Sequence, residues 1–233
     1  MVQCVSNWLF SPMGWDAAMS SEFSNDKTIQ SMFQAAHDCH EKGLLSEAYQ
    51  LYSELLALEP NHFDALHLSG LIAYQTSNPE LATRLISDAI AIKPDIPAFH
   101  NNLGIAFHEM GEYSKALEHY QIAQQLKPDY LSAFYNAGNA SYAIGNLDGA
   151  AGYYEKAISL DSSYVDAHLN LGIVFYDLSH FDYAIACFDL ALSYRPDYEA
   201  AFFNRGMAYE AIGELQKALL DYDRAIIFDP EHQ

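Results

Sequence analysis

The sequence predicts an all-α solenoid of six helical hairpins, because four kinds of residue recur on one 34-residue period. Proline marks five of the six units, at Pro60, Pro94, Pro128, Pro196 and Pro230, with Ser162 in the remaining slot. Alanine recurs without exception, at Ala48, Ala82, Ala116, Ala150, Ala184 and Ala218. Glycine forms a third column, at Gly70, Gly104, Gly138, Gly172 and Gly206, with Ala36 in the first unit. An aromatic column is interrupted only by Ile86: Tyr52, Tyr120, Tyr154, Phe188 and Tyr222.

Each column has a physical role in a hairpin. Glycine and alanine lie on different helices of a pair, where small side chains allow the two backbones to approach closely. The aromatic residue lies four positions after its alanine, on the same helix face, and fills the space beside that contact. Proline follows the second helix and prevents its continuation. Short breakers separate the two helices, at Gly43, Asn78-Pro79, Gly111, Gly145, Ser179-His180 and Gly213.

These columns divide the chain into a short N-terminal segment, residues 1–28, and a solenoid, residues 29–233. The expected repeats are 29–62, 63–96, 97–130, 131–164, 165–198 and 199–232. The N-terminal segment contains Trp8 and Trp15 and is expected to be an irregular cap on the first repeat. Alternatively it lies in a groove, or is an added leader. At the other end the last helix carries Leu219 and Ile226 with no further helix after it, which predicts either a longer parent protein or contact with another chain.

The unit AFHNNLGIAFHEMGEYSKALEHYQIAQQLKPD, residues 98–129, carries Leu-Gly, an aromatic residue, alanine, tyrosine, alanine and proline in the order of a known repeat. The sequence resembles the tetratricopeptide repeat family over roughly residues 29–233. That resemblance implies antiparallel helix pairs stacked into a right-handed superhelix, with the first helix of each pair lining an inner groove. It also implies a non-catalytic scaffold that binds a peptide or protein segment.

One groove column is rich in asparagine and reads Gln34, Leu68, Asn102, Asn136, Asn170 and Asn204. An asparagine side chain can pair with both the C=O and the N–H of an extended peptide. The array resembles the asparagine ladder in the repeat domain of the O-linked N-acetylglucosamine transferases, which holds substrate polypeptide. The alternative is that these asparagines bridge adjacent helices. Because four consecutive repeats keep the residue, we expect peptide contact.

Neighbouring columns supply the other expected peptide-binding residues: Asn101, Tyr135, Asn139, His108, Tyr142 and Tyr176. None of the eleven lysines and arginines falls in these columns. Related chaperone-binding domains clamp a C-terminal carboxylate with basic residues, but here Phe33 and His67 stand at the lysine positions. A buried carboxylate would have no cationic partner. The expected ligand is therefore neutral or basic, with apolar anchors.

Composition excludes several other functions. The net charge of −20 argues against nucleic acid and anionic membrane surfaces as partners. Three cysteines, widely spaced and odd in number, do not form a disulfide framework. No stretch is long and apolar enough for a membrane span, and the N-terminus does not read as a signal peptide. We expect a soluble cytoplasmic protein.

The sequence contains none of the motifs that mark an active site, such as a phosphate-binding glycine loop or a nucleophile elbow. His37 and His40 lie one helical turn apart and could share a metal, but a third ligand is needed for zinc. We therefore expect neither catalysis, nor a metal, nor a cofactor. Two alternatives to an independent scaffold remain open. The chain could be the substrate-recruiting arm of a larger enzyme such as a glycosyltransferase, or a module that self-assembles through its ends.

Overall fold

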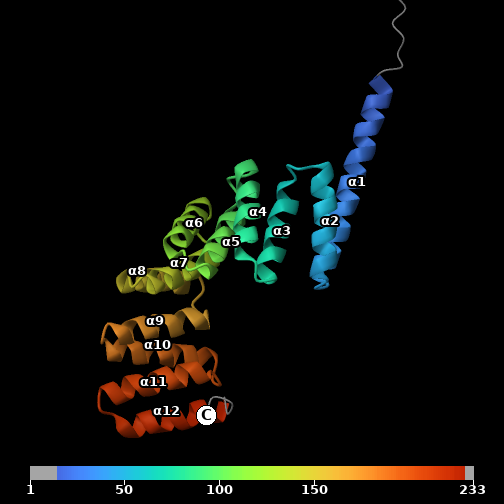
Figure 1. Ribbon diagram of the computed structural model, residues 1–233. Coiled ribbons are helices and arrows are strands. Elements are labelled where there is room, and N and C mark those ends of the chain that lie inside the picture. The colour runs from blue at the N-terminus through green and yellow to red at the C-terminus, as the bar shows by residue number, and fades with distance from the viewer. Residues whose placement is uncertain (1–14, 229–233) are drawn as a thin grey trace, which may run out of the picture.

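The computed structural model describes residues 15–228, with side chains from residue 27 onward, and every regular element in that range is an α-helix. The helices are α1 (Trp15–Glu41), α2 (Leu45–Leu58), α3 (Phe63–Gln75), α4 (Pro79–Ile92), α5 (Pro97–Glu109), α6 (Tyr113–Leu126), α7 (Leu131–Ala143), α8 (Leu147–Leu160), α9 (Val165–Asp177), α10 (Phe181–Tyr194), α11 (Glu199–Ala211) and α12 (Leu215–Phe228). Consecutive helices pair as antiparallel hairpins that stack along the chain (Figure 1). The axes of the hairpins turn progressively from α1 to α12, which gives the expected superhelical solenoid.

Each hairpin is closed by the contact that the glycine and aromatic columns predict. A Cβ atom added to Gly104 would lie 2.5 Å from the ring of Tyr120, and one added to Gly138 would lie 2.5 Å from Tyr154. In the second hairpin the ring is replaced by Ile86, whose side chain occupies the same space over Gly70. The ring therefore fills the volume that a larger residue would need, and it is buried in the process.

The turn inside each hairpin requires one residue with left-handed backbone. Gly111 takes φ of 74° in the third hairpin, a conformation that glycine adopts without steric cost. Where glycine is missing, the same conformation falls on serine: Ser77 has φ of 59° and Ser179 has φ of 61°. The turn geometry is thus kept in the two hairpins that lack the glycine, at the cost of strain in a serine.

The N-terminal segment differs from the expectation of irregular structure. Residues 15–28 form the first part of α1, which runs without a break into the first hairpin. A continuous helix needs no tertiary partner to satisfy its backbone hydrogen bonds, so this segment can project beyond the stack, as Figure 1 shows. Residues 1–14 and 229–233 lie outside the described part of the chain, and so does the expected role of Trp8. The side chain of Trp15 is also outside it.

Candidate functional site

The first helices of the hairpins, α3, α5, α7, α9 and α11, form one continuous surface, which we call the inner face. Asparagines on this surface connect neighbouring repeats. The Asn102 amide lies 2.9 Å from His67 Nε2, and the Asn136 amide donates to Asn101 Oδ1 at 3.1 Å. The partners in each pair are 35 residues apart, one repeat and one residue. The same offset joins Asn170 to the hydroxyl of Tyr135 at 3.1 Å.

This geometry gives the asparagines a structural role in addition to any contact with a ligand. Three of the four predicted asparagines use their amide groups to bridge to the preceding repeat, which is the alternative that the sequence left open. Asn204 is the exception, because Leu169 stands at the partner position and offers no polar atom. Its amide bonds the Ala200 carbonyl of its own helix at 2.7 Å.

Two tyrosines of the aromatic column, Tyr120 and Tyr154, reach from the second helix of a hairpin to the cavities on the inner face. The hydroxyl of Tyr154, in α8, donates to Asn139 Oδ1 in α7 at 2.7 Å. Asn139 also accepts a hydrogen bond from the amide of Asn170 at 3.1 Å. The carboxamide oxygen of Asn139, in α7, therefore connects α8 with α9. Burial raises the pKa of Tyr154 and of Tyr120 above the ordinary tyrosine value. Both hydroxyls therefore stay protonated, which keeps Tyr154 as the donor to Asn139.

Two cavities lie on the inner face and are equivalent under the 34-residue repeat. Cavity A, of about 80 Å³, is lined by Tyr74, Ile105, His108, Glu109, Tyr120, Asn136 and Asn139. Cavity B, of about 280 Å³, is lined by His108, Asn139, Tyr142, Ala143, Tyr154, Asn170 and Ile173. Adding 34 to each position of the first set gives the second set, without exception. The repeat has thus built the same site twice, with different side chains in it.

The cavities bring together five of the ten residues predicted for peptide binding: His108, Asn136, Asn139, Tyr142 and Asn170. Tyr135 and Asn101 instead serve as bonding partners of the asparagines. Tyr176 packs edge-on against Phe181. Tyr120 and Tyr154, which the sequence predicts only as packing residues, also line the cavities. Their hydroxyl groups could have indicated this role from the sequence, because phenylalanine would serve equally well for packing alone, without a buried polar atom.

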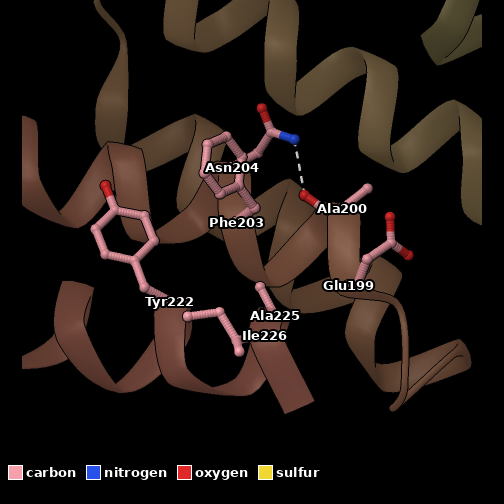
Figure 2. Close-up of a pocket in the computed structure, with 7 residues that line it drawn as sticks. All are labelled: Glu199, Ala200, Phe203, Asn204, Tyr222, Ala225 and Ile226. Carbon is pink, nitrogen blue, oxygen red and sulfur yellow. Dashed lines mark hydrogen bonds between the residues drawn. The ribbon is translucent and has the colours of Figure 1, made fainter. Parts of the chain in front are cut away.

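A third and larger cavity, of about 500 Å³, lies on the C-terminal hairpin between α11 and α12. Figure 2 shows its lining: Glu199, Ala200, Phe203, Asn204, Tyr222, Ala225 and Ile226. Phe203 and Ile226 are each 50% exposed. The cavity holds the predicted residue Asn204 but is not equivalent to the other two, because all of its lining residues come from the single hairpin of α11 and α12.

The charge of the inner face is negative or neutral around cavities A and B. Neither cavity has a lysine or arginine in its lining, and Glu109 supplies a carboxylate to cavity A. Burial lowers the pKa of His108, with Glu109 acting in the opposite direction. Tyr142, at the mouth of cavity B, is 39% exposed and its hydroxyl donates to Asp177 at 2.7 Å. This surface suits a ligand that carries positive charge or none.

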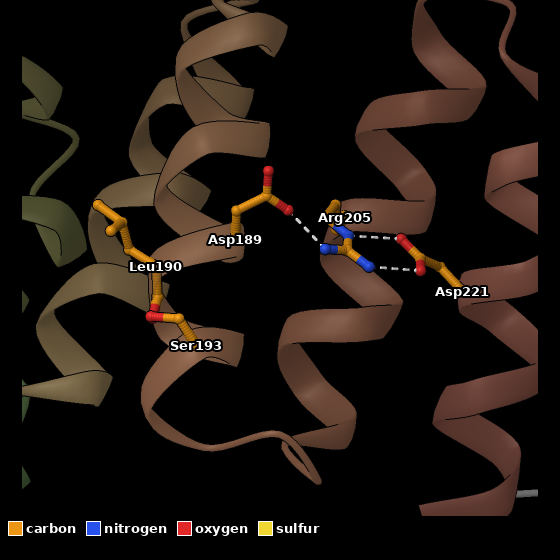
Figure 3. A network of polar contacts seen from close by, with 5 residues as sticks. All are labelled: Asp189, Leu190, Ser193, Arg205 and Asp221. Atoms are coloured by element: carbon orange, nitrogen blue, oxygen red, sulfur yellow. Dashed lines mark hydrogen bonds and ion pairs between the residues drawn. The ribbon is translucent and has the colours of Figure 1, made fainter.

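Arginine enters the solenoid core at one place near the inner face. The guanidinium of Arg205, in α11, forms two hydrogen bonds of 2.7 Å with Asp221 in α12. It also pairs with Asp189 in α10, so that one side chain ties three helices together (Figure 3). Because its Nε, Nη1 and Nη2 atoms all bond to carboxylates, Arg205 contributes no free cation to a ligand site.

The metal-binding candidate differs from the pair considered in the sequence. His40 lies 3.0 Å from Gln75 Oε1 and is engaged with the next hairpin. The described residues instead place His37, Asp38 and Glu41 within 4.8 Å of one another. His37 Nδ1 is 3.8 Å from Glu41 Oε1, and Asp38 accepts from Gln34 at 2.7 Å. These three side chains are solvated and already paired, so they form a surface network at the end of α1.

Sequence comparisons identify the family. Profiles described as tetratricopeptide repeat match residues 97–130 and 169–232, and a profile described as TPR repeat matches residues 138–179. The chain belongs to the tetratricopeptide repeat family, whose members are typically non-catalytic scaffolds for protein interaction. Among the described helices, none has the length and apolar character that a membrane span requires.

Among curated proteins, the chain is similar to N-alpha-acetyltransferase 25, the NatB auxiliary subunit, of rat and human. The identity is 33% over 73 residues, which is 31% of this chain and 8% of each relative. The chain thus spans a small fraction of the length of these relatives.

Solved structures show the same fold at low identity. PilW, a type IV pilus biogenesis factor, has a TM-score of 0.77 at 17% identity and covers 88% of this chain and 94% of its own. PilF of Pseudomonas aeruginosa has a TM-score of 0.76 at 18% identity, over 89% and 95%. YrrB, described as having an unusual peptide-binding site, has a TM-score of 0.65 at 18% identity, over 78% and 93%.

Proposed function

We propose that the protein is a non-catalytic scaffold that holds an extended peptide or protein segment along its inner face. The observation that carries this proposal is the pair of equivalent cavities, A and B, each with an asparagine and a tyrosine hydroxyl in its lining. Two sites related by the repeat suit a ligand that itself extends along the stack. The peptide-binding site named for YrrB, and the auxiliary role named for the NatB relatives, support a binding function of this kind.

The asparagine ladder takes a narrower role in this proposal. Asn136 and Asn170 already direct their amide groups toward the preceding repeat. Their carboxamide oxygens accept no hydrogen bond from the described residues and can accept one from a peptide N–H. The bridges hold the side chains in place before a ligand arrives, which lowers the entropy lost on binding. Asn102 and Asn204 extend the same row to either side.

The partner in this proposal is neutral or basic, with apolar anchors, and binds in the cytoplasm. Nucleic acid and membrane surfaces are excluded by the same charge argument, because the inner face has no free cation near either cavity. Catalysis is not part of the proposed function. The substrate-recruiting arm of a larger enzyme remains a special case of it, in which the same inner face would serve a catalytic domain on the same chain or on another.

A cavity-blocking variant tests this function without removing the asparagine bridges. Ala143 is exposed at the end of α7 and lines cavity B, so Ala143→Trp should fill the cavity and leave the stack intact. Peptides selected from a random display library on the unmodified chain should bind the variant at least about tenfold more weakly, a loss of about 1.4 kcal/mol. Ala91→Trp, at an exposed position on α4, is the matched control. Equal binding to all three proteins would refute the inner face as the binding surface.

Self-association is a second candidate function, favoured by the surface of α12. Leu215, Leu219 and Leu220 are 65%, 62% and 65% exposed. Ile185, which corresponds to Leu219 one repeat earlier, packs in the core against the following hairpin. We propose that this flank of the isolated chain pairs with a second copy. Sedimentation should show association that Leu219→Glu with Ile226→Glu abolishes, and a monomer at high concentration before any substitution would refute it.

A further inference from the structure

Cavities A and B differ in chemistry at the one position that can supply charge. Glu109 lines cavity A, and its equivalent in cavity B is Ala143. The glutamate is exposed at the end of α5 and forms no ion pair with another described residue. A cationic side chain that enters cavity A would therefore meet an available carboxylate, whereas the same side chain in cavity B would meet a methyl group.

The remaining lining reinforces this difference. Cavity A is narrow, at about 80 Å³, and offers the hydroxyl-bearing rings of Tyr74 and Tyr120 beside the carboxylate. This volume admits only a slender side chain, whose charged end would lie beside the carboxylate of Glu109. Cavity B, at about 280 Å³, is more than three times larger and has Ile173 where cavity A has Asn139. It fits a bulky apolar side chain.

The described residues around His108, which lines both cavities, carry no positive charge that would repel a cation in cavity A. His108 lines both cavities, and burial lowers its pKa, so the ring is neutral near pH 7. Beside cavity B, the carboxylate of Asp177 already accepts a hydrogen bond from the hydroxyl of Tyr142 at 2.7 Å and does not line the cavity. The nearest lysine along this hairpin, Lys115, is engaged by Glu112 at 3.3 Å on the second helix.

The spacing of the cavities sets the spacing of the ligand's anchors. Equivalent points on neighbouring packed helices are separated by about 8–10 Å, and α5, α7 and α9 are in contact through the bonds of Asn136 and Asn170. A peptide in the extended polyproline II conformation rises about 3.1 Å per residue and has about three residues per turn. Two anchors in neighbouring cavities are therefore about three residues apart in the ligand, with both side chains on the same side of the peptide.

We propose that the inner face between α3 and α9 reads a two-residue code in an extended segment: a lysine or arginine in cavity A and, three residues away, a leucine, methionine or phenylalanine in cavity B. This specificity rests on the proposed peptide-binding function and adds the ligand's chemistry to it. Because the asparagine oxygens of Asn136 and Asn170 meet the ligand main chain in one direction, the order of the two anchors along the peptide is fixed.

Synthetic peptides test the code directly. The probes are capped, fluorescently labelled peptides with one lysine and one leucine in a glycine-serine background, separated by one to four positions and made in both orders. Fluorescence anisotropy at low salt should show the tightest binding for one order at a separation of three, by about fivefold over separations of one and two. Replacing lysine with glutamine in that probe should lose the same factor.

Two variants of the protein sharpen the test. Glu109→Ala should lower affinity for the lysine probe by about fivefold and leave the glutamine probe unchanged, whereas the exposed control Glu118→Ala should change neither. Combining Glu109→Ala with Ala143→Glu moves the carboxylate to cavity B, so the preferred order of lysine and leucine should reverse. Both positions are exposed at helix ends, and circular dichroism should show an unchanged fold.

The outcomes separate this inference from the function on which it rests. If peptides selected from the display library bind but the probes show no preference for separation or order, the two-residue code is wrong and the scaffold function stands. An unchanged order preference in the double variant would also overturn the code. If neither the library nor the probes yield binding that Ala143→Trp weakens, both proposals fail together.

Discussion

The centre of the solenoid and its C-terminal hairpin differ in the polar interactions that connect their helices. Around α7, neutral side chains bridge the repeats, as in the bond between Asn136 and Asn101. In the last hairpin the ion pair of Arg205 and Asp221 occupies positions that hold Leu171 and Cys187 one repeat earlier (Figure 3). Neutral amides cost less to desolvate than charges do, whereas a buried ion pair is stable only while it is complete. The difference predicts where the molecule is most sensitive to substitution.

The largest effect is expected from breaking the C-terminal ion pair. Asp221→Ala leaves the guanidinium of Arg205, whose side chain is 18% exposed, with Asp189 as its remaining partner. The free energy of unfolding of this hairpin should fall by about 3 kcal/mol, because an incompletely paired buried charge remains. Hydrogen exchange should show the loss in α11 and α12. Asp223→Ala, at an exposed position of the same helix, is the control.

The preceding repeat supplies a rescue for this variant. Arg205→Leu combined with Asp221→Cys reproduces the pair Leu171 and Cys187, which are both buried. This double variant should recover most of the lost stability, because an apolar pair of suitable size can replace a buried ion pair at little cost. If Asp221→Ala were as stable as the Asp223→Ala control, the ion pair would not hold the hairpin.

A second test compares the contact inside the hairpins, which the two regions share. Gly104→Ala should destabilise the protein by about 1–3 kcal/mol, because the new methyl group overlaps the ring of Tyr120 and that ring is 1% exposed. Gly206→Ala creates the same overlap with Tyr222, but this ring is only half-buried and borders the cavity of about 500 Å³, into which it can move. Its cost should be smaller. Thermal unfolding of both variants measures the two losses of stability. An equal loss would show that the ring of Tyr222 is held as rigidly as the ring of Tyr120.

Acid should weaken one of the neutral bridges. Burial lowers the pKa of His67 from 6.5 to about 4, and its Nε2 accepts a hydrogen bond from Asn102. Between those two pH values the unfolded chain binds a proton that the folded chain does not, so stability falls as pH drops from about 6.5 toward 4. At pH 5 the loss from this group is about 2 kcal/mol.

The adjacent bridge provides the control for this pH dependence. His67→Asn creates the asparagine pairing that Asn101 and Asn136 form one repeat later. Urea titrations at pH 7 and pH 5 should show a smaller loss in this variant than in the unmodified chain. Other histidines contribute equally to both proteins and cancel in the comparison. An identical loss would show that His67 does not control the acid sensitivity of this junction.

The smallest expected effect is a gain. Gly152, in the middle of α8, has open space around its added Cβ, so Gly152→Ala should stabilise the helix by about 1 kcal/mol. Gly149 is different, because an added Cβ would lie 2.4 Å from Asn146, whose side chain caps the helix. Gly149→Ala should therefore not stabilise. Hydrogen exchange of residues 147–160 checks both, since glycine and Ser162 predict that α8 opens more readily than its neighbours.

Much of the candidate site could be predicted from the period alone. The period predicts that the columns of Asn136, Asn139 and Tyr142 share one surface, because one repeat unit fixes which positions of each first helix lie together, and these residues line cavities A and B. The cavities themselves could not be predicted. Each cavity depends on how far an aromatic side chain of the second helix extends toward the first helix, as Tyr154 extends to Asn139. The spacing of residues along one helix does not contain the distance between two helices.

The sequence by itself determined the architecture, because glycine, alanine, an aromatic residue and proline at fixed positions permit only one way for two helices to pack, and the repeat copies it along the chain. It did not determine how polar side chains are paired. Whether Asn170 faces a ligand or Tyr135 depends on the 35-residue offset between stacked helices, which is a property of the assembled superhelix. The tertiary structure decided that the asparagine amides bridge repeats and that Arg205 is held by two aspartates, because only the stack brings those partners within bonding distance.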